Sequence, residues 1–424
     1  MIQVIRPGMR TGTVHVPASK STAHRLLIAA ALSKTPCRVF CRGVSKDIEA
    51  TARCLNALGA KIEYAEDPGV FTVRPVRSKI CPPKTCDLYC GESGTTLRFL
   101  LPLAAALGRK AVFHMEGLLS KRPMGPLTEA LMQHGVRVFA QDELLFSEGQ
   151  LQPGEYRMPG NISSQFISGL LLSLPLLNAD SRLVITENIE SEGYIDMTEQ
   201  VLLQAGVRFE KDAACYRIFG DQDYSLPAET KVESDWSGAA AFLCMGALSK
   251  EGISIPGMNL QSCHADTAIL NVLKDFGADI QVRDGLLSVK KCQCRPFTVD
   301  ASNAPDLVPV VSALACAADG ESRIIHAERL RLKESDRLKT TSAMLNALGA
   351  KVTETADGLV IRGTGTLSGG MIDPANDHRI AMAAAVAASV CKDPVTIRNS
   401  ECVGKSYPKF YEDLEKLDLQ SFPG

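Results

Sequence analysis

The chain has 424 residues, of which 45% are hydrophobic and 22% charged, and its formal net charge at pH 7 is -2. These values are ordinary for a soluble globular protein and give no general reason to expect binding to nucleic acid or to an anionic membrane. The length exceeds what one hydrophobic core usually serves and favours two domains of about 200 residues each.

No targeting, membrane or metal-binding segment is expected. The N-terminal stretch MIQVIRPGMRTGTVHVPASKS has no apolar signal-peptide core, and no uncharged apolar run reaches the roughly 20 residues of a membrane span. The 14 cysteines fit free thiols in a reducing cytosol. Neither Cys81, Cys86 and Cys90 nor the pair Cys292 and Cys294 has the paired spacing of a zinc site. We therefore expect a cytoplasmic protein without a metal ion.

One short pattern recurs along the chain and predicts the end of a helix followed by a strand. Leucines fall on one helix face, a glycine then supplies a left-handed cap, and an alternating strand follows. The copies are LNALGAKIE (55–63), LMQHGVRVF (131–139), LLQAGVRFE (202–210), LKDFGADIQ (273–281) and LNALGAKVT (345–353), with LEKLD (414–418) as a degenerate sixth in which Asp418 replaces the glycine. The five glycines, 71 to 76 residues apart, are Gly59, Gly135, Gly206, Gly277 and Gly349.

A second marker has the same period and predicts helix starts. Each marker precedes a run rich in Ala and Leu, and Ser, Thr and Asp are the residues that cap helix N-termini. The markers, 71 residues apart, are Ser93, Ser164, Asp235, Asp306 and Asp377, and one step earlier lies Thr22, beside Ser21. The two markers together predict an α/β fold of six βαβαββ repeats in which the capped helices are buried.

Six repeats suggest two domains of three repeats each. The last repeat lacks its closing strands, and IQVIRPGMRTGTVHVPASKS is similar to GLVIRGTGTLSGGMIDPANDH, the stretch before the sixth capped helix. We therefore expect residues 18–230 to form the N-terminal domain, and residues 1–17 together with 231–424 to form the C-terminal domain. Two chain crossings would make a hinge, and helix N-termini facing the inter-domain cleft would attract anions there.

Polar side chains gather at the predicted helix starts. Each motif has an ordinary explanation when taken alone, such as a solvated charged helix face, a cap or an exposed loop. Their recurrence at equivalent repeat positions favours a single anion-binding site instead. The motifs are PASKSTAHR, GESGTTLR, KRPMGPL, NISSQ, ESEGYID, RLRLKESDRL, DPANDHRIAM and KSYPKF.

Except for ESEGYID, these motifs, with DWSGAAAF and APDLVP, make the chain similar to the EPSP synthase family of enolpyruvyl transferases over nearly its whole length. The resemblance implies a two-domain inside-out α/β barrel, each domain holding three βαβαββ repeats with buried helices. It also implies transfer of the enolpyruvyl group of phosphoenolpyruvate to the 5-hydroxyl of shikimate 3-phosphate, which needs no cofactor or metal. The expected partners are these two small molecules, with no nucleic acid and no membrane, and we expect a monomer.

The resemblance also implies roles for individual residues. Proton transfer is expected of Asp306 and Glu334, with Lys20 as a third catalytic group. The shikimate 3-phosphate contacts are expected to be Lys20, Ser21, Arg25, Ser163, Ser164, Gln165, Ser191, Asp306 and Lys333. The phosphoenolpyruvate contacts are expected to be Lys20, Gly94, Arg122, Gln165, Arg337, Arg379 and Lys405.

Three positions depart from the family's usual pattern, and two alternative functions stay open. Glu92 and Arg329 each stand where the family usually has Asn, and Tyr194 follows SEG where SKP is usual. One alternative is the same chemistry on a UDP-sugar, as in UDP-N-acetylglucosamine enolpyruvyl transferase. The other is a non-catalytic anion-binding repeat protein, which would give no reason for both Asp306 and Glu334 beside a cationic site.

Overall fold

The computed structural model describes residues 1–76 and 85–420, so Cys81 of the first cysteine group lies outside the described residues. The chain divides into two compact units, Lys20–Val232 and Met1–Ser19 with Glu233–Gly424. Within the described ranges, no disulfide bond joins two cysteines. None of the described helices combines the length and the apolar character that a membrane crossing requires.

The unit Lys20–Val232 contains three sheets built on one plan. Their strand orders are β14-β3-β5-β4, β6-β7-β9-β8 and β10-β11-β13-β12. In each sheet the first two strands run parallel and the remaining pairs are antiparallel. The strands are β3 (Cys37–Phe40), β4 (Lys61–Ala65), β5 (Val70–Arg74), β6 (Cys86–Gly91), β7 (Ala111–Met115), β8 (Val136–Gln141), β9 (Leu144–Gly149), β10 (Glu155–Met158), β11 (Ser181–Ile185), β12 (Phe209–Asp212), β13 (Cys215–Ile218) and β14 (Glu229–Lys231).

Three helices of this unit, α1, α3 and α5, are rich in Ala or Leu and are buried almost all round. No face of these helices carries a continuous polar stripe. Helix α3 packs on α5, and α1 packs on α2 and α6. The helices are α1 (Lys20–Leu32), α2 (Lys46–Ala57), α3 (Gly94–Ala106), the 3₁₀ helix η1 (Leu119–Lys121), α4 (Gly125–Gln133), α5 (Ser164–Ser173), η2 (Leu174–Leu176) and α6 (Glu192–Gln204).

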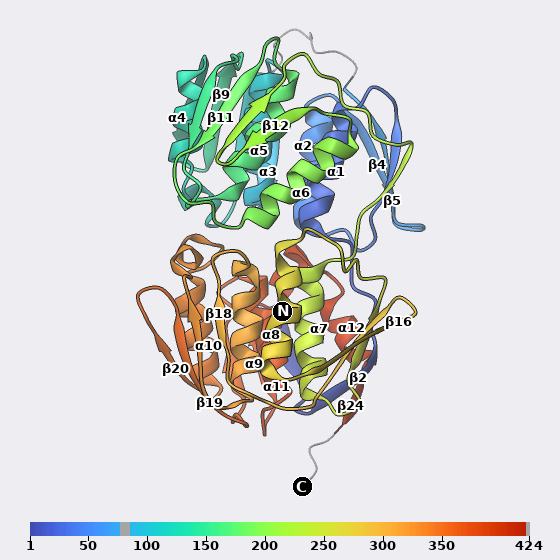
Figure 1. The fold of residues 1–424 in the computed structure, drawn as a ribbon, viewed down its shortest axis with the longest axis vertical. Coiled ribbons are helices and arrows are strands. Elements are labelled where there is room, and N and C mark those ends of the chain that lie inside the picture. The colour runs from blue at the N-terminus through green and yellow to red at the C-terminus, as the bar shows by residue number, and fades with distance from the viewer. Residues whose placement is uncertain (77–84, 421–424) are drawn as a thin grey trace. The chain divides into compact units, whose positions relative to one another are not determined.

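The second unit repeats the plan with three further sheets. Their orders are β16-β17-β15-β2-β24, β18-β19-β21-β20 and β1-β23-β22. Figure 1 shows the blue strand β2 beside the red strand β24, so the two chain ends share a sheet. The strands are β1 (Ile2–Ile5), β2 (Met9–Thr13), β15 (Ile253–Pro256), β16 (Asp279–Arg283), β17 (Leu286–Lys290), β18 (Thr298–Asp300), β19 (Asp319–Ile325), β20 (Lys351–Glu354), β21 (Leu359–Thr364), β22 (Gly370–Ile372), β23 (Val395–Arg398) and β24 (Asp418–Gln420).

Three buried helices, α7, α9 and α11, pack on one another at the centre of this unit. Alanine makes up much of α11, and small side chains allow such close helix packing. The helices are α7 (Trp236–Leu248), η3 (Ala265–Ala268), α8 (Ile269–Phe276), η4 (Pro305–Leu307), α9 (Val308–Ala315), η5 (Glu328–Leu332), α10 (Arg337–Ala347), α11 (His378–Ala388), η6 (Ser400–Lys405) and α12 (Phe410–Glu415). The six small mixed sheets with buried helices confirm the predicted fold class.

Two repeats exchange their opening strands. Strand β2 precedes α1 in the chain, yet it pairs in parallel with β15 of the fourth repeat. Strand β14 precedes α7, yet it pairs in parallel with β3 of the first repeat. Strand β1 pairs with β23 of the sixth repeat. The N-terminal residues therefore contribute strands to two repeats of this unit.

The predicted helix ends hold, but only some of the predicted caps do. All five marker glycines have positive φ, and Gly277, with φ 86°, is the C-cap of α8. Ser93, Asp235 and Asp377 cap α3, α7 and α11 through their side chains.

Three cap predictions were wrong. Thr22 lies inside α1, and the cap of α5 is Ser163 rather than Ser164. Asp306 lies within the 3₁₀ helix η4, and neither η4 nor α9 has a side-chain cap. Pro305 favours a tight turn at this point, because its fixed φ suits the first positions of a helix. The Asp306 carboxylate is therefore available for other partners.

Candidate active site

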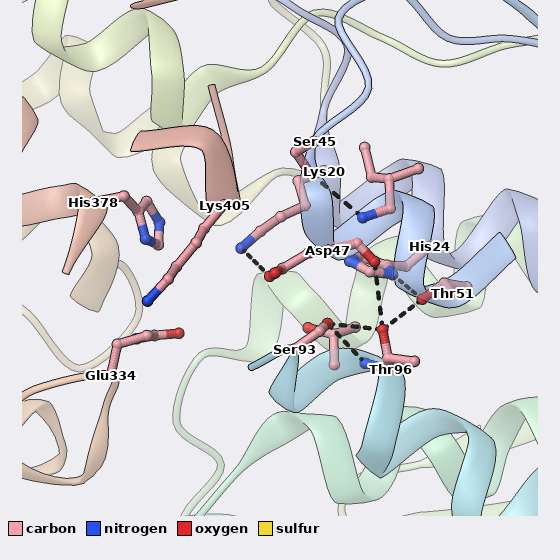
Figure 2. A network of polar contacts seen from close by, with 12 residues as sticks. Lys20, His24, Ser45, Asp47, Thr51, Ser93, Thr96, Glu334, His378 and Lys405 are labelled. Carbon is pink, nitrogen blue, oxygen red and sulfur yellow. Dashed lines mark hydrogen bonds and ion pairs between the residues drawn. The ribbon is translucent and has the colours of Figure 1, made fainter. Parts of the chain in front are cut away.

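Lys20 is the first residue of α1, and an ion pair fixes its position. Its Nζ lies 3.1 Å from Asp47 Oδ2, and the two side chains are 14% and 13% exposed. Asp47 lies in the first turn of α2, which Ser45 caps by accepting the Ile48 amide at 3.5 Å. Figure 2 shows this pair beside a network of further polar contacts. An amine held so near the surface can meet an anionic ligand.

Arg25 is buried and joins three helices. Its Nε donates to Thr198 Oγ1 at 2.7 Å, its Nη1 to the Ser21 carbonyl at 2.7 Å, and its Nη2 to the Tyr194 carbonyl at 2.7 Å. A further contact joins Nη2 to Ser168 Oγ at 3.5 Å, and the guanidinium lies over the Phe99 ring. These bonds use most of the five N–H groups of an arginine, so Arg25 holds α1, α5 and α6 together.

The start of α3 brings Gly94 against Arg122. Ser93 caps the helix by accepting the Thr96 amide at 3.2 Å. A Cβ added at Gly94 would lie 2.7 Å from Arg122 Nη1, so the absence of a side chain leaves room for that guanidinium. Glu92 turns toward the neighbouring turn, because a Cβ at Gly117 would lie 2.8 Å from its Oε2. The expected pair of Gly94 and Arg122 is thus brought together.

Gln165, in the first turn of α5, is held at both ends of its amide. Its Nε2 donates to Thr95 Oγ1 at 2.8 Å, and its Oε1 accepts from Arg98 Nη1 at 2.7 Å. Arg98 also donates to the Pro123 carbonyl at 3.0 Å, next to Arg122. Arg98 therefore connects the start of α5 to the segment that carries Arg122, a link that the sequence motifs did not reveal.

Three of the serines expected in the site lie at two helix starts. Ser163 caps α5 by accepting the Gln165 amide at 3.3 Å, and the buried Ser164 follows it. Ser191 is buried and precedes α6 with a left-handed backbone (φ 57°). A non-glycine residue in that conformation is uncommon and is found most often at constrained or functional positions.

The second unit carries a cluster of buried and half-buried ions around Arg337, the first residue of α10. Arg337 Nη1 lies 2.8 Å from Asp306 Oδ1, Nη2 lies 2.7 Å from Glu334 Oε2, and Nε lies 2.8 Å from Asp377 Oδ2. Arg379 Nη2 reaches the other Asp306 oxygen, Oδ2, at 3.0 Å. Asp306 thus bridges two arginines, with Glu334 on the first of them.

The charges of this cluster shift the pKa values of its members. Burial raises the pKa of Asp306, but Arg379, Arg337 and Lys333 outweigh it and hold that pKa well below its usual value. Burial lowers the pKa of the Lys333 amine to about 8, with Asp306 opposing the change and Arg337 and Arg329 adding to it. A cation and a carboxylate with perturbed pKa values at one place are typical of a functional site.

Three further residues lie near the helix starts of this unit. Lys405 Nζ donates to the Asn376 carbonyl at 2.6 Å, and the residue is buried at the end of η6. Figure 2 shows the Lys405 amine extending toward the Glu334 carboxylate, with His378 alongside. Arg329, one of the departures from the family pattern, donates to the Ser302 carbonyl at 3.0 Å.

The expected site residues thus form two groups, one in each unit. Residues of the first unit are Lys20, Ser21, Arg25, Gly94, Arg122, Ser163, Ser164, Gln165 and Ser191, and those of the second are Asp306, Lys333, Glu334, Arg337, Arg379 and Lys405. Sequence reasoning missed Asp47 and Arg98. The available signal for Arg98 was a lone charge inside the apolar run LRFLLPLAAAL, since such a charge needs a partner when buried.

Comparisons with known proteins identify the family of this chain. A sequence profile described as EPSP synthase (3-phosphoshikimate 1-carboxyvinyltransferase) matches residues 6–414. The 3-phosphoshikimate 1-carboxyvinyltransferase of Clostridium novyi is 38% identical over 97% of this chain and 96% of its own. The enzyme of that name from Clostridium acetobutylicum is 41% identical over the same shares.

Comparison with solved structures also finds EPSP synthase. A solved structure of EPSP synthase from Acinetobacter baumannii superposes with a TM-score of 0.80 and 25% identity, covering 99% of this chain and 98% of that one. The family profile and these relatives each cover almost the whole chain. The chain therefore belongs to the EPSP synthase (3-phosphoshikimate 1-carboxyvinyltransferase) family.

Proposed function

We propose that this protein transfers the enolpyruvyl group of phosphoenolpyruvate to the 5-hydroxyl of shikimate 3-phosphate and releases phosphate. The observation that carries this proposal is the Asp306 carboxylate bridging Arg337 and Arg379, with Glu334 on the same arginine. It combines anion-binding groups with two half-buried carboxylates for proton transfer in one cluster. A simple anion-binding protein would need only the cations.

Both substrates are multiply anionic, so joining them requires several cations. Arginine can hold a phosphate or a carboxylate through two parallel bonds, and lysine supplies a compact charge. We assign phosphoenolpyruvate to Lys20, Gly94, Arg122, Gln165, Arg337, Arg379 and Lys405. We assign shikimate 3-phosphate to Lys20, Ser21, Arg25, Ser163, Ser164, Gln165, Ser191, Asp306 and Lys333.

The reaction needs a base for the hydroxyl and an acid near C3 of phosphoenolpyruvate. The hydroxyl oxygen adds to C2 while C3 gains a proton, and then phosphate leaves and C3 loses a proton. We assign these transfers to Asp306 and Glu334, with Lys20 stabilising charge on the phosphate. An anion bound by Arg337 and Arg379 would offset two of the three positive charges that hold the pKa of Asp306 low. Substrate binding would thereby make Asp306 a better base.

Each unit carries only part of this set, so we propose that the two units close around the substrates. The chain passes from one unit to the other twice, after Ser19 and after Val232, and two crossings can act as a hinge. Closure would exclude water from the reaction intermediate. We further propose that the protein acts as a cytoplasmic monomer.

Phosphate release measures this function directly. The purified protein is mixed with phosphoenolpyruvate and shikimate 3-phosphate, and inorganic phosphate is followed over time. We expect phosphate only when both substrates are present. Parallel mixtures with phosphoenolpyruvate alone, and with UDP-N-acetylglucosamine in place of shikimate 3-phosphate, should stay at background. Release with the UDP-sugar alone would assign the protein to the alternative reaction, and no release in any mixture would contradict the proposal.

A further inference from the structure

A chain of buried hydroxyl groups joins the starts of three helices beneath Lys20. His24 Nδ1 lies 2.7 Å from Thr51 Oγ1, and Thr51 Oγ1 lies 2.7 Å from Thr96 Oγ1. Thr96 Oγ1 lies 2.7 Å from Ser93 Oγ, and it approaches the Asp47 carbonyl at 3.5 Å. We call His24, Thr51, Thr96 and Ser93 the buried relay. None of its four residues is more than 1% exposed.

The contact between His24 and Thr51 joins the same two helices as the Lys20–Asp47 ion pair, one helical turn further along each helix. His24 follows Lys20 by four residues in α1, and Thr51 follows Asp47 by four residues in α2. Residues four apart lie on the same helix face. The bond between His24 and Thr51 therefore sets the distance and rotation of α1 and α2 just where Lys20 and Asp47 meet.

The third helix is tied in through Thr96. This residue lies one position beyond Thr95, which bonds Gln165, and its amide is capped by Ser93. Gly94 lies between Ser93 and Thr95, against Arg122. The buried relay thus connects the helix starts that carry the groups proposed to bind phosphoenolpyruvate. The relay itself does not reach the surface.

The protonation of His24 follows from its surroundings. Burial, with Lys20 and Arg25 nearby, holds the pKa of the imidazole well below its usual value, so the ring is neutral. Its Nε2 is buried and has no hydrogen-bond partner. A buried N–H left without a partner is rarer in proteins than an unused acceptor. The proton therefore lies on Nδ1, and His24 donates to Thr51.

We propose that His24 and Thr51 are positioning residues for phosphoenolpyruvate binding, which hold Lys20 and the start of α3 in their productive arrangement. This inference rests on the proposed function, since it concerns the same site. Neither residue is expected to touch the substrate. Loss of the bond would let Lys20 and Gly94 shift relative to each other, and small displacements of binding groups are costly to catalysis.

Two pairs of variants test the inference. Thr51→Val keeps the shape and removes the hydroxyl, whereas Thr51→Ser keeps the hydroxyl. His24→Asn places an amide N–H where Nδ1 stands, whereas His24→Gln places it near Nε2. We expect Thr51→Val and His24→Gln to lower kcat/KM for phosphoenolpyruvate on the order of 10- to 100-fold. Thr51→Ser and His24→Asn should stay within about twofold of the native value by the same reasoning.

A control and a double variant separate positioning from loss of stability. Ser173→Ala removes a fully buried hydroxyl that donates to the Gly169 carbonyl in α5, outside the relay, and should leave kcat/KM unchanged. In a Lys20→Ala background, Thr51→Val should have a smaller effect than in the native protein, because part of its effect acts through Lys20. Thermal unfolding of each variant checks that it is folded.

The results of these experiments distinguish failure of the positioning role from failure of the proposed function. Native kinetics for both Thr51→Val and His24→Gln would overturn the positioning role. So would equal losses for His24→Asn and His24→Gln, or a full effect of Thr51→Val in the Lys20→Ala background. If the native protein releases no phosphate from the two substrates, the proposed function fails instead, and the comparison of variants does not arise.

Discussion

At the scale of single residues, Asp306 shows how the structure changes an expectation. As a helix cap, Asp306 could be replaced by Asn with little loss of stability, because Asn caps well. The structure instead pairs its carboxylate with Arg337 and Arg379. Its pKa lies well below the usual value, so the ionised form stabilises the fold at neutral pH, and this contribution is lost as the pH falls through the pKa of the folded state.

We therefore predict that Asp306→Asn lowers both turnover and stability. Turnover should fall roughly 10²-fold or more, the usual scale of general acid–base catalysis. The free energy of unfolding should fall by about 1–3 kcal/mol, because two buried arginines lose a charged acceptor. Steady-state kinetics and denaturant unfolding measure the two effects. Asp275→Asn, at an exposed position of α8, is the matched control. Near-normal turnover in Asp306→Asn would remove its catalytic role.

The lowered pKa of Lys333 predicts that substrate binding depends on pH. Its amine has a pKa of about 8 in the ligand-free protein, so it loses its charge as the pH rises above that value. Affinity for shikimate 3-phosphate should therefore fall from pH 7 to pH 9. In the unfolded chain the pKa of Lys333 would return to its ordinary, higher value. The charged amine therefore disfavours folding below pH 8. The Lys333 contribution to the free energy of unfolding should become more favourable as the pH rises through 8 toward 10.

Calorimetric titration with shikimate 3-phosphate across this pH range provides the measurement. In Lys333→Arg the side chain stays charged, so the fall in affinity above pH 8 should disappear. The same fall in both proteins would place the titrating group elsewhere.

At the scale of elements, the junction of α3 and η1 makes a prediction about Gly94. A methyl group at this position would meet the Arg122 guanidinium at 2.7 Å, and that guanidinium is the far end of a flexible side chain. Gly94→Ala should therefore fold normally but displace Arg122. We expect the KM for phosphoenolpyruvate to rise about tenfold, equivalent to roughly 1.4 kcal/mol, with the KM for shikimate 3-phosphate nearly unchanged. Equal increases in both values would show that Arg122 is not the group displaced.

The elements also show what the sequence could and could not predict. Helix ends followed from glycines with a clear physical role, and Gly277 is the C-cap of α8 as expected. Caps were harder, because Ser163 and Ser164 are chemically equivalent in the sequence and only the backbone angles decide between them. The exchange of β2 and β14 depends on pairing between strands that are distant in the chain, and no local pattern encodes that pairing.

Contacts between distant segments also limited the prediction of the site residues. Lys20, Gln165 and Arg337 could be picked out because they stand at helix starts in recognisable motifs. Asp47 and His24 could not, since their importance comes from partners on other helices. Polar residues on adjoining buried faces become informative only when the packing of α1, α2 and α3 is known.

At the scale of the whole molecule, two chain crossings and a divided set of site residues predict closure on substrate binding. Small-angle scattering of the protein with and without shikimate 3-phosphate tests this idea. We expect a smaller radius of gyration with the ligand, and no change with shikimate, which lacks the phosphate. An unchanged radius at saturating shikimate 3-phosphate would contradict closure by the first substrate.

The proposed reaction forms one new carbon–oxygen bond, and the identity of the product is its most direct test. The protein is incubated with shikimate 3-phosphate and phosphoenolpyruvate labelled with carbon-13 at C2, and the mixture is followed by carbon and phosphorus magnetic resonance. We expect the label to move to an enol ether on the 5-oxygen of shikimate 3-phosphate as inorganic phosphate appears in equal amount. Phosphate accompanied by labelled pyruvate, with shikimate 3-phosphate unchanged, would contradict it.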